Sequence, residues 1–181
     1  MFGRALDSAP LLEYVGYVVK QSRIRAFKKV SGKLRRIWAG PDQPREKDGE
    51  MLRLLVVDGE ESICFSMKEY FTMQGYKVDT ARELEEAEKL VETSDYKVVI
   101  QDLRLGPAQK PEGLEMIKFI RNHSPHARII VLTAYGSAEM ELEALRNGAD
   151  AFLRKPKPLS HVAQVIQGLI ELPPKQTAQG A

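Results

Sequence analysis

The sequence has a single cysteine, no long apolar run and little net charge. Because Cys64 is the only cysteine, an intramolecular disulfide is excluded, which fits a reducing cytoplasm. Its place in the helical pattern ESICFSMKEYF predicts a buried, apolar thiol. No apolar run reaches the roughly 18 residues that span a bilayer, and the basic residues near the start follow the apolar stretch instead of preceding it. We therefore expect neither a transmembrane helix nor a secretory signal.

The net charge of +2 conceals two parts of opposite sign. Residues 1–50 carry 11 Lys or Arg against 6 Asp or Glu, a net charge of +5, whereas residues 51–181 carry 16 against 19, a net charge of −3. This asymmetry indicates two parts that face different partners. The length of 181 residues and the 43% hydrophobic content suit one domain of ordinary size with an appendage.

From residue 51 onward, short apolar runs alternate with helical patterns, which is typical of strands alternating with helices. The runs predict strands at 52–57, 76–80, 96–101, 127–132 and 151–154, and helices at 62–74, 82–92, 114–122, 137–146 and 159–172. Right-handed crossovers then predict an α/β fold, a doubly wound five-stranded parallel sheet of order 2-1-3-4-5 with helices on both faces. We assign residues 51–172 to this domain and 173–181 to a flexible tail, and expect no room for a DNA-binding output domain.

Residues 1–38 are predicted to form a helical extension with a basic, amphipathic end. The next segment, residues 39–50, has two prolines, two glycines and six charges, which predicts a linker. At 100° per residue, the apolar residues of the extension fall within an arc of about 140°. They are Ile24, Phe27, Val30, Leu34, Ile37 and Trp38.

Several occupants suit the apolar face of this extension. It can lie on an anionic membrane surface or dock in a partner's groove. It can also pack on its own domain, or on a second copy to give a homodimer. Contact with nucleic-acid phosphates is the least favoured of these alternatives.

Four polar residues stand at or just past the ends of predicted strands. Asp58 ends the run LLVVD, Asp102 ends KVVIQD, Thr133 ends IIVLT, and Lys155 follows ADAFLR. Because the carboxyl ends of parallel strands meet at one edge of a sheet, we expect these residues to converge there. That edge is where open α/β sheets bind ligands.

The order of these residues resembles that of the receiver domain of two-component response regulators, over roughly residues 52–172. The 22-residue step from Thr133 to Lys155 is part of the resemblance. The resemblance implies that Asp102 accepts a phosphoryl group from a histidine kinase or phosphotransfer protein. It also implies a switch in which Thr133 moves towards the phosphoryl group and Phe152 takes the vacated space, with the fourth helix, fifth strand and fifth helix as readout face. A cis peptide between Lys155 and Pro156 is a further implication.

These residue types suit phosphoryl transfer. A carboxylate and a phosphoryl group are both anionic, so catalysis must be mainly electrostatic and positional. Oxygens of Asp58, Asp102 and the backbone carbonyl of Arg104 can hold Mg²⁺, which neutralises phosphoryl oxygens. Lys155 can reach another phosphoryl oxygen, and Thr133 can donate a hydrogen bond.

The sequence departs from the family at Gly59, where receivers usually carry a second acid. The metal pocket is one carboxylate short, so we expect weak Mg²⁺ binding unless Glu60 reaches the metal from the loop. A second departure places Gly113 eleven residues after Asp102, where the common pattern has eight. The inserted residues include Pro107 and Pro111.

Two further positions bear on the lifetime of a phosphoaspartate. In the family, the residues two beyond the acceptor and two beyond the hydroxyl flank the route of the hydrolysing water. Here they are Arg104 and Tyr135. Both are bulky, which predicts a long-lived phosphoryl group.

The leading interpretation is a single-domain response regulator, not an enzyme, that signals through protein contacts in the cytoplasm or at the inner membrane surface. One alternative is a phosphorylation-independent pseudo-receiver that acts as a scaffold. Another is a phosphatase of the haloacid dehalogenase type, with Asp58 as nucleophile and Glu60 in place of the usual second aspartate. The cap of such enzymes is missing, so this alternative is the least favoured.

Overall fold

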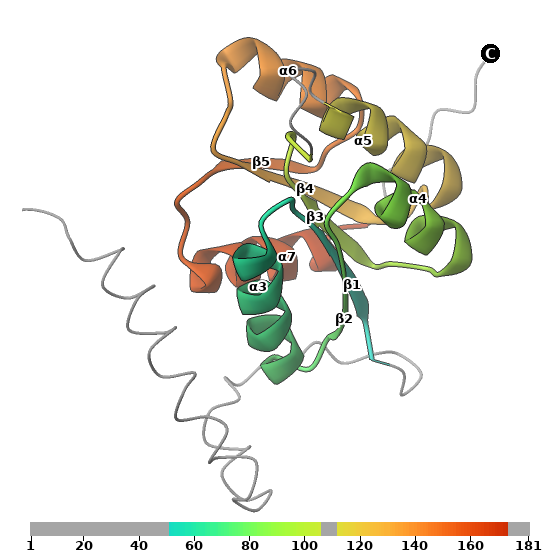
Figure 1. The fold of residues 1–181 in the computed structure, drawn as a ribbon, viewed down its shortest axis with the longest axis vertical. Coiled ribbons are helices and arrows are strands. Elements are labelled where there is room, and N and C mark those ends of the chain that lie inside the picture. Colours follow the sequence, from blue (N-terminus) through green and yellow to red (C-terminus); the bar gives the residue numbers. More distant parts are fainter. Residues whose placement is uncertain (1–50, 106–111, 174–181) are drawn as a thin grey trace, which may run out of the picture.

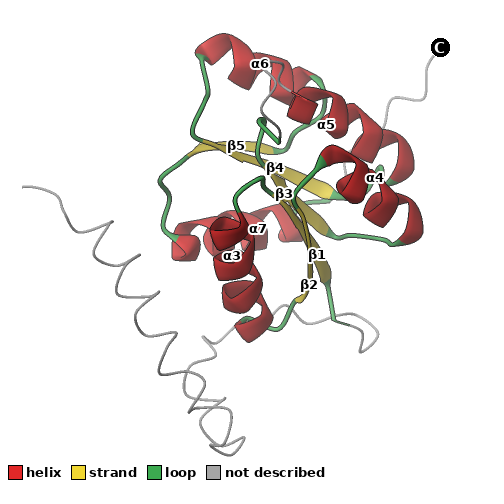
Figure 2. Ribbon diagram, in the orientation of Figure 1, coloured by secondary structure: helices red, strands yellow, loops and turns green. Residues whose placement is uncertain are grey.

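The computed structural model describes residues 51–105 and 112–173, which form a five-stranded parallel sheet of order β2-β1-β3-β4-β5 with helices on both faces (Figure 1). The strands are β1 (Arg53–Val57), β2 (Lys77–Ala81), β3 (Val98–Gln101), β4 (Arg128–Thr133) and β5 (Ala151–Arg154). The helices are α3 (Glu61–Met73), α4 (Leu84–Thr93), α5 (Glu112–His123), α6 (Ala138–Arg146) and α7 (Leu159–Glu171) (Figure 2). The predicted α/β architecture and strand order are confirmed.

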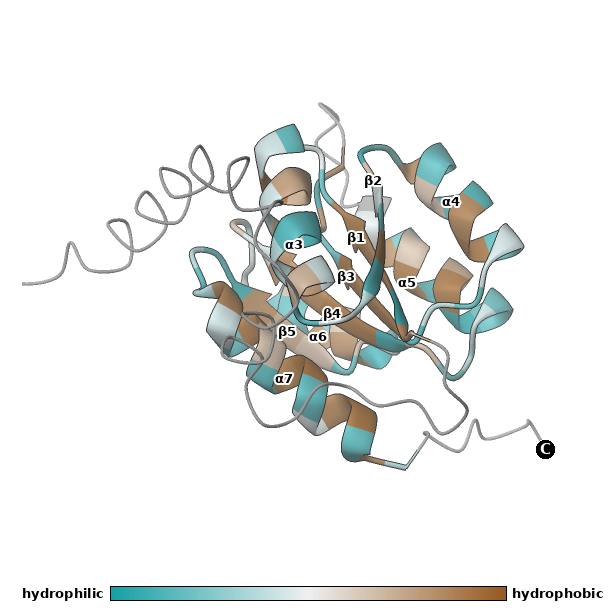
Figure 3. Cartoon of the chain, turned by 90° about the horizontal axis from the view of Figure 1, so that it is seen from below, coloured by the Kyte–Doolittle hydropathy of each residue, from teal (hydrophilic) through white to brown (hydrophobic). Residues whose placement is uncertain are grey.

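The central strands are apolar on both faces because helices cover both (Figures 1 and 3). Helices α3 and α7 lie on one face, and α4, α5 and α6 lie on the other. In β1, Leu54 and Val56 join the core beneath α3 and α7, whereas Leu55 and Val57 join the core beneath α4 to α6. Strands β3 and β4 divide their residues in the same way. A sheet with two covered faces therefore explains the continuous apolar runs of the sequence.

The core beneath α3 and α7 is built around Phe71, which is fully buried. Its ring packs edge-on against Tyr70 and Tyr76, with centroids 5.2 and 6.0 Å away. Burying a side chain of this size stabilises the fold by roughly 1.5–3 kcal/mol. Cys64 is buried in the same core, as expected, and burial raises the pKa of its thiol to about 11.

Helix α4 begins at Leu84, two residues later than the sequence predicts. The backbone of Glu83 is extended, with φ −133° and ψ 156°, and the Glu86 carboxylate accepts a hydrogen bond from the backbone N–H of Arg82 at 2.9 Å. This contact gives a partner to a backbone donor just ahead of the helix. Strand β2 runs on to Ala81, whose carbonyl accepts a hydrogen bond from the backbone N–H of Asp58 at 3.0 Å.

Several predicted segments lie outside the described residues: the extension at 1–38, the linker at 39–50, and nearly all of the tail at 173–181. Within the described ranges, none of the helices has the length and apolar character needed to cross a membrane.

Candidate functional site

Lys155 contacts both Asp58 and Asp102 at the carboxyl edge of the sheet. Strand β3 lies beside β1 with Val57 paired to Gln101, so the residues that follow, Asp58 and Asp102, are level with each other. The Lys155 ammonium reaches across from the end of β5, with Nζ 2.5 Å from Asp58 Oδ2 and 2.8 Å from Asp102 Oδ2. We call these three residues the acceptor cluster.

The acceptor cluster holds two carboxylates and one ammonium away from solvent. Asp58 is 4% exposed and Asp102 is 8% exposed. Their second oxygens, the Oδ1 atoms, accept hydrogen bonds from the backbone N–H groups of Glu60 at 3.0 Å and Arg104 at 3.2 Å. With both acids ionised, the cluster carries one negative charge in excess.

Burial and hydrogen bonding have opposite effects on the pKa values of Asp58 and Lys155. Burial raises the pKa of Asp58, and the hydrogen bonds from Lys155 and from the Glu60 N–H offset only part of that rise. For Lys155, burial alone would lower the pKa, but the hydrogen bonds to Asp102 and Asp58 outweigh it and the pKa is raised. Lys155 therefore stays charged, and the effect of burial is seen in the raised pKa of Asp58.

Thr133 is fully buried at the end of β4, at the same edge of the sheet. The backbone N–H of Lys155 donates to its carbonyl oxygen at 2.8 Å. Its hydroxyl oxygen accepts a hydrogen bond from the N–H of Tyr135 at 3.2 Å and donates to the Tyr135 carbonyl at 3.3 Å. The Thr133 hydroxyl is thus bonded within its own loop, next to the acceptor cluster.

Phe152 is half-buried on β5 and packs against the core beneath α4 to α6. Its ring lies so close to Gly136, in the loop between β4 and α6, that a Cβ there would be 2.8 Å from the ring. The aromatic predicted to respond to Thr133 is therefore already in contact with the loop that Thr133 precedes. The Lys155–Pro156 peptide is cis, as expected.

The two carboxylates fit a magnesium site. The Oδ2 atoms of Asp58 and Asp102 both lie within 2.8 Å of the same ammonium nitrogen, so they converge on one point. Mg²⁺ is usually held by one or two carboxylates together with waters and substrate phosphates. In the described part of the chain, no group of three or more His, Cys, Asp or Glu is placed to hold a metal. Among the described residues, the site therefore offers Mg²⁺ the two carboxylates of Asp58 and Asp102 and no third acid.

Gly59 offers no side-chain ligand, yet its position has room for one. A Cβ there would lie 3.4 Å from the carbonyl oxygen of Leu105, which is an ordinary contact. Glu60 is exposed, and it is its backbone N–H that contacts Asp58. The missing carboxylate is thus a feature of the sequence and is not imposed by crowding.

Sequence reasoning missed the contacts of Gly113, near the start of α5. Gln101 is fully buried, and its side-chain amide donates to the carbonyl of Gly113 at 2.6 Å. The Gly113 N–H donates to the carbonyl of Leu103 at 3.1 Å, and a Cβ on Gly113 would lie 2.6 Å from the carbonyl oxygen of Asp102. Only glycine allows this approach. The start of α5 is therefore fixed against the backbone around Asp102, and the one signal for it was a glutamine closing an otherwise apolar strand.

Arg104 and Tyr135, the two positions predicted to tune lifetime, contact each other. The Arg104 guanidinium carbon lies 3.7 Å from the centroid of the Tyr135 ring, well within cation–π distance. Both side chains are exposed. The sequence named both residues but could not reveal the contact, because the residues belong to different loops.

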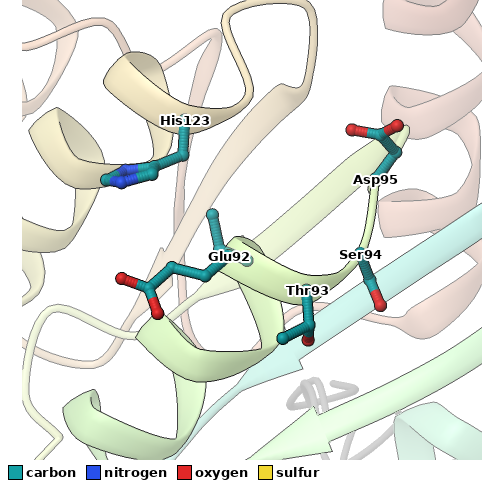
Figure 4. Close-up of a pocket in the computed structure, with 6 residues that line it drawn as sticks. Glu92, Thr93, Ser94, Asp95 and His123 are labelled. Atoms are coloured by element: carbon teal, nitrogen blue, oxygen red, sulfur yellow. The ribbon is translucent and has the colours of Figure 1, made fainter.

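A shallow hollow of about 240 Å³ lies elsewhere, between the ends of α4 and α5 (Figure 4). Its lining consists of Val91, Glu92, Thr93, Ser94, Asp95 and His123. These residues precede β3 and β4, so the hollow is at the amino ends of the strands. It contains none of the acceptor cluster, and we do not assign the site to it.

The predicted interaction residues Ile24, Phe27, Val30, Leu34 and Trp38 lie outside the described residues. Of the predicted site residues that the structure describes, Lys155 contacts both Asp58 and Asp102. Arg104 and Thr133 are bonded to Asp102 and Lys155 through backbone groups, and Tyr135 is bonded to Thr133.

Comparison with known proteins places this arrangement in context. Residues 54–167 match the model of the response regulator receiver domain. The chain is 30% identical over 122 residues to the response regulator protein PilR of Pseudomonas aeruginosa, covering 66% of this chain and 26% of PilR. It therefore spans about a quarter of the length of curated relatives such as PilR.

Two solved structures are similar in fold and sequence. One is a response regulator from Burkholderia pseudomallei with a phosphorylated aspartic acid, a calcium ion and citrate. It has a TM-score of 0.61 and 30% identity, covering 66% of this chain and 68% of that one. The other is the beryllofluoride-activated NtrC4 receiver domain dimer, with a TM-score of 0.58 and 36% identity, covering 66% of this chain and 96% of that one.

Proposed function

We propose, on the premise that this chain belongs to the response regulator receiver domain family, that it accepts a phosphoryl group on Asp102 from a histidine kinase or phosphotransfer protein and signals through protein contacts. The observation that carries this proposal is the Lys155 ammonium bridging Asp58 and Asp102 at the carboxyl edge of the sheet. The Burkholderia pseudomallei relative, with its phosphorylated aspartic acid, supports it.

The acceptor cluster suits an attack by the Asp102 carboxylate on phosphorus. A carboxylate oxygen forms the new O–P bond as the bond between phosphorus and the donor nitrogen breaks, and the leaving group takes up a proton. Lys155 then exchanges one carboxylate contact for a phosphoryl oxygen, which keeps its charge compensated. Mg²⁺, when held by Asp58, Asp102 and the Arg104 carbonyl, supplies neutralising charge.

The Thr133 hydroxyl supplies the link to the rest of the fold. To donate to a phosphoryl oxygen it must give up its hydrogen bond to the Tyr135 carbonyl, which frees the loop between β4 and α6. Phe152 lies against Gly136 in that loop, so the ring and the loop must adjust together. This supports Thr133 and Phe152 as the switch, with α6, β5 and α7 as the readout face.

The deciding experiment is to incubate the full chain with phosphoramidate and Mg²⁺ and to locate any adduct by mass spectrometry. A single phosphoryl adduct on Asp102, absent from an Asp102→Asn variant, is the expected result. An adduct on Asp58 would favour the phosphatase alternative. No adduct under conditions that label a known receiver would sink the proposal.

A second candidate function is a pseudo-receiver that binds partners without being phosphorylated, and Gly59 is the observation that favours it. A pocket with two acids binds Mg²⁺ more weakly than one with three, and phosphoryl transfer to a carboxylate depends on that charge. The absence of any adduct, together with unchanged partner binding in Asp102→Asn, would support this candidate.

The partners beyond the phosphodonor are also proposals. The solved NtrC4 receiver is a dimer, which supports a homodimer for this chain. The basic residues 1–38 suit an anionic membrane surface at the cytoplasmic side or a partner's groove. Co-sedimentation with anionic liposomes, with and without residues 1–40, tests the membrane alternative, and binding that survives the truncation would remove it.

A further inference from the structure

Gln101 is a polar residue in an apolar core, one position before Asp102. It ends strand β3 and is fully buried, and its register partners on both sides are valines, Val57 in β1 and Val131 in β4. Its side-chain oxygen Oε1 has no hydrogen-bond partner in the described part of the chain. Buried polar atoms are nearly always paired, because an unpaired one loses its hydration without compensation. If stability alone decided this position, an apolar side chain would suit it better.

The amide nitrogen of Gln101 begins a series of hydrogen bonds that leads back to Asp102. Nε2 donates to the carbonyl of Gly113 at 2.6 Å, and the Gly113 N–H donates to the carbonyl of Leu103 at 3.1 Å. The residue after Leu103 is Arg104, whose backbone N–H donates to Asp102 Oδ1 at 3.2 Å. The contacts therefore form a ring that starts beside the acceptor and ends on its carboxylate.

Gly113 contacts the backbone around the acceptor closely because it has no side chain. A Cβ there would lie 2.6 Å from both the Asp102 carbonyl oxygen and the Leu103 Cα. A shift of Gly113 must therefore also move Leu103 and the backbone that follows it, up to the N–H that holds the Asp102 carboxylate. A nucleophile is sensitive to displacements of about 1 Å, because its attack needs a defined distance and direction.

We propose that Gln101 is a positioning residue of the phosphoryl site: by holding Gly113, its amide sets the direction of the Asp102 carboxylate. The inference deepens the proposed function and rests on it. Gln101 acts through Gly113, Leu103 and Arg104 and does not itself contact the phosphoryl group. The unpaired Oε1 leads to a specific prediction, because an apolar replacement should impair the site without weakening the fold.

The test is a Gln101→Met variant of the full chain, which keeps the length of the side chain and removes its amide. The rate of labelling is measured at saturating Mg²⁺ over a range of phosphoramidate concentrations. The maximal rate should fall roughly tenfold, because the carboxylate attacks from a poorer direction, and the concentration that gives half of this rate should not change. The urea concentration at the midpoint of unfolding should equal or exceed that of the wild type.

Two further variants separate positioning from stability. Gln101→Asn keeps an amide but is one methylene shorter, so it loses the contact with Gly113 and should slow labelling as Gln101→Met does. Ile129→Val is the matched control, because Ile129 is fully buried in the same core beneath α4 to α6. It should lower the urea midpoint and leave the rate of labelling unchanged.

The backbone amide of Arg104 reports on the ring of contacts without a phosphodonor. In proton NMR spectra of Gln101→Met, its resonance should move upfield, because its hydrogen bond to Asp102 Oδ1 is weakened. The same resonance should stay in place in Ile129→Val.

A lower maximal rate with an unchanged or higher urea midpoint supports the proposal. An unchanged rate in Gln101→Met overturns it, and so does full labelling of Gln101→Asn. A lower rate that comes with a lower midpoint would show a structural role and overturn it as well. If phosphoramidate does not label the wild type, the proposed function fails. The Arg104 resonance then decides the inference by itself: a shift in Gln101→Met supports it, and no shift overturns it.

Discussion

Two buried ion clusters lie at opposite ends of the sheet, and they differ in how their charges are compensated. The acceptor cluster stands at the carboxyl ends of the strands. At the amino ends of β4 and β5, Asp150 contacts Arg121 at 2.6 Å and Arg128 at 3.6 Å, and its side chain is 2% exposed. We call these three residues the arginine cluster.

The side chains of the arginine cluster are also hydrogen-bonded to backbone groups around them. Arg121 donates to the carbonyls of Gly148, Ala127 and Pro125, and Asp150 accepts a further hydrogen bond from the N–H of Ile129 at 2.8 Å. Arg128 donates to the carbonyls of Leu172 and Pro173, just past the end of α7. Besides the two ion pairs, these contacts tie side chains to backbone groups, so the cluster fastens α5, the end of α7 and the loop before β5 to the sheet.

The acceptor cluster differs because its one ammonium is shared by two carboxylates, whereas the arginines also donate to backbone carbonyls. Lys155 can leave one acid for an incoming anion without becoming unpaired, whereas Arg121 has no such freedom among its backbone partners. Burial and ion pairing therefore do not distinguish the two clusters, and neither does charge balance, because each carries one uncompensated charge. They differ in their other contacts: the guanidinium groups are also held by backbone carbonyls, whereas the Lys155 ammonium contacts the two carboxylates.

Removing the acid of the arginine cluster should have the largest effect on stability. Asp150→Ala leaves two largely buried guanidinium groups without their carboxylate, which costs about 3 kcal/mol of the free energy of unfolding. Urea unfolding followed by circular dichroism measures the change. Glu115→Ala, which removes an exposed acid from α5, should stay within about 0.5 kcal/mol. Equal losses in the two variants would contradict the assigned role.

Removing Lys155 from the acceptor cluster should lower the free energy of unfolding by less than Asp150→Ala does, and the loss should depend on pH. Lys155→Met leaves two buried carboxylates that repel each other, so we expect a loss of about 2 kcal/mol at neutral pH. In this variant the pKa of Asp58, which burial already raises, rises further because the hydrogen bond from Lys155 is lost. The proton it takes up stabilises the fold at low pH, and that contribution is lost as the pH rises. Urea unfolding at several pH values checks this, and a loss that grows on acidification would refute it.

Removing the acceptor itself should abolish labelling with little effect on folding. Asp102→Asn leaves Lys155 paired one-to-one with Asp58, so the excess negative charge disappears. We expect the free energy of unfolding to change by no more than about 1 kcal/mol, in either direction. Mass spectrometry after phosphoramidate treatment should show no adduct. A loss as large as that of Asp150→Ala would mean that the two clusters do not differ in the way described.

Restoring the missing acid should have the smallest effect on stability and should sharpen the difference between the clusters. Gly59→Asp has room for its Cβ, so we expect a change of about 0.5 kcal/mol or less in the free energy of unfolding. A third carboxylate should tighten Mg²⁺ binding by about tenfold. Titration calorimetry measures the Kd. Unchanged affinity would show that Gly59 is not what limits the metal site.

Most of the fold was accessible from the sequence because its elements are marked locally. The apolar runs at 52–57 and 127–132 predicted β1 and β4 to within a residue at each end, and the helix predicted at 62–74 matches α3, which Gly75 follows with φ 94°. The start of α4 was less accessible. Residues 82 and 83 are as polar as the helix that follows, and it is a tertiary contact, from Asp58 to Ala81, that keeps β2 extended there.

Within the candidate site, the sequence identified residue types but not their contacts. Asp58, Asp102 and Lys155 were recognisable because each follows an apolar run, and parallel strands must bring such positions to one edge. Two contacts could not be recognised from the local sequence. They are the hydrogen bond between Gln101 and Gly113 and the cation–π contact between Arg104 and Tyr135. Each joins residues more than ten positions apart, whose meeting depends on how two loops are placed.

The sequence by itself therefore determined the order of strands and helices, the edge at which the acids and the lysine gather, and the lack of a second acid at Gly59. These follow from hydrophobic periodicity and chain connectivity, which are local properties. Only the tertiary structure decided that Lys155 is shared between Asp58 and Asp102, while Arg121 and Arg128 enclose Asp150. Charge compensation depends on distances between strands, and those distances are set by packing.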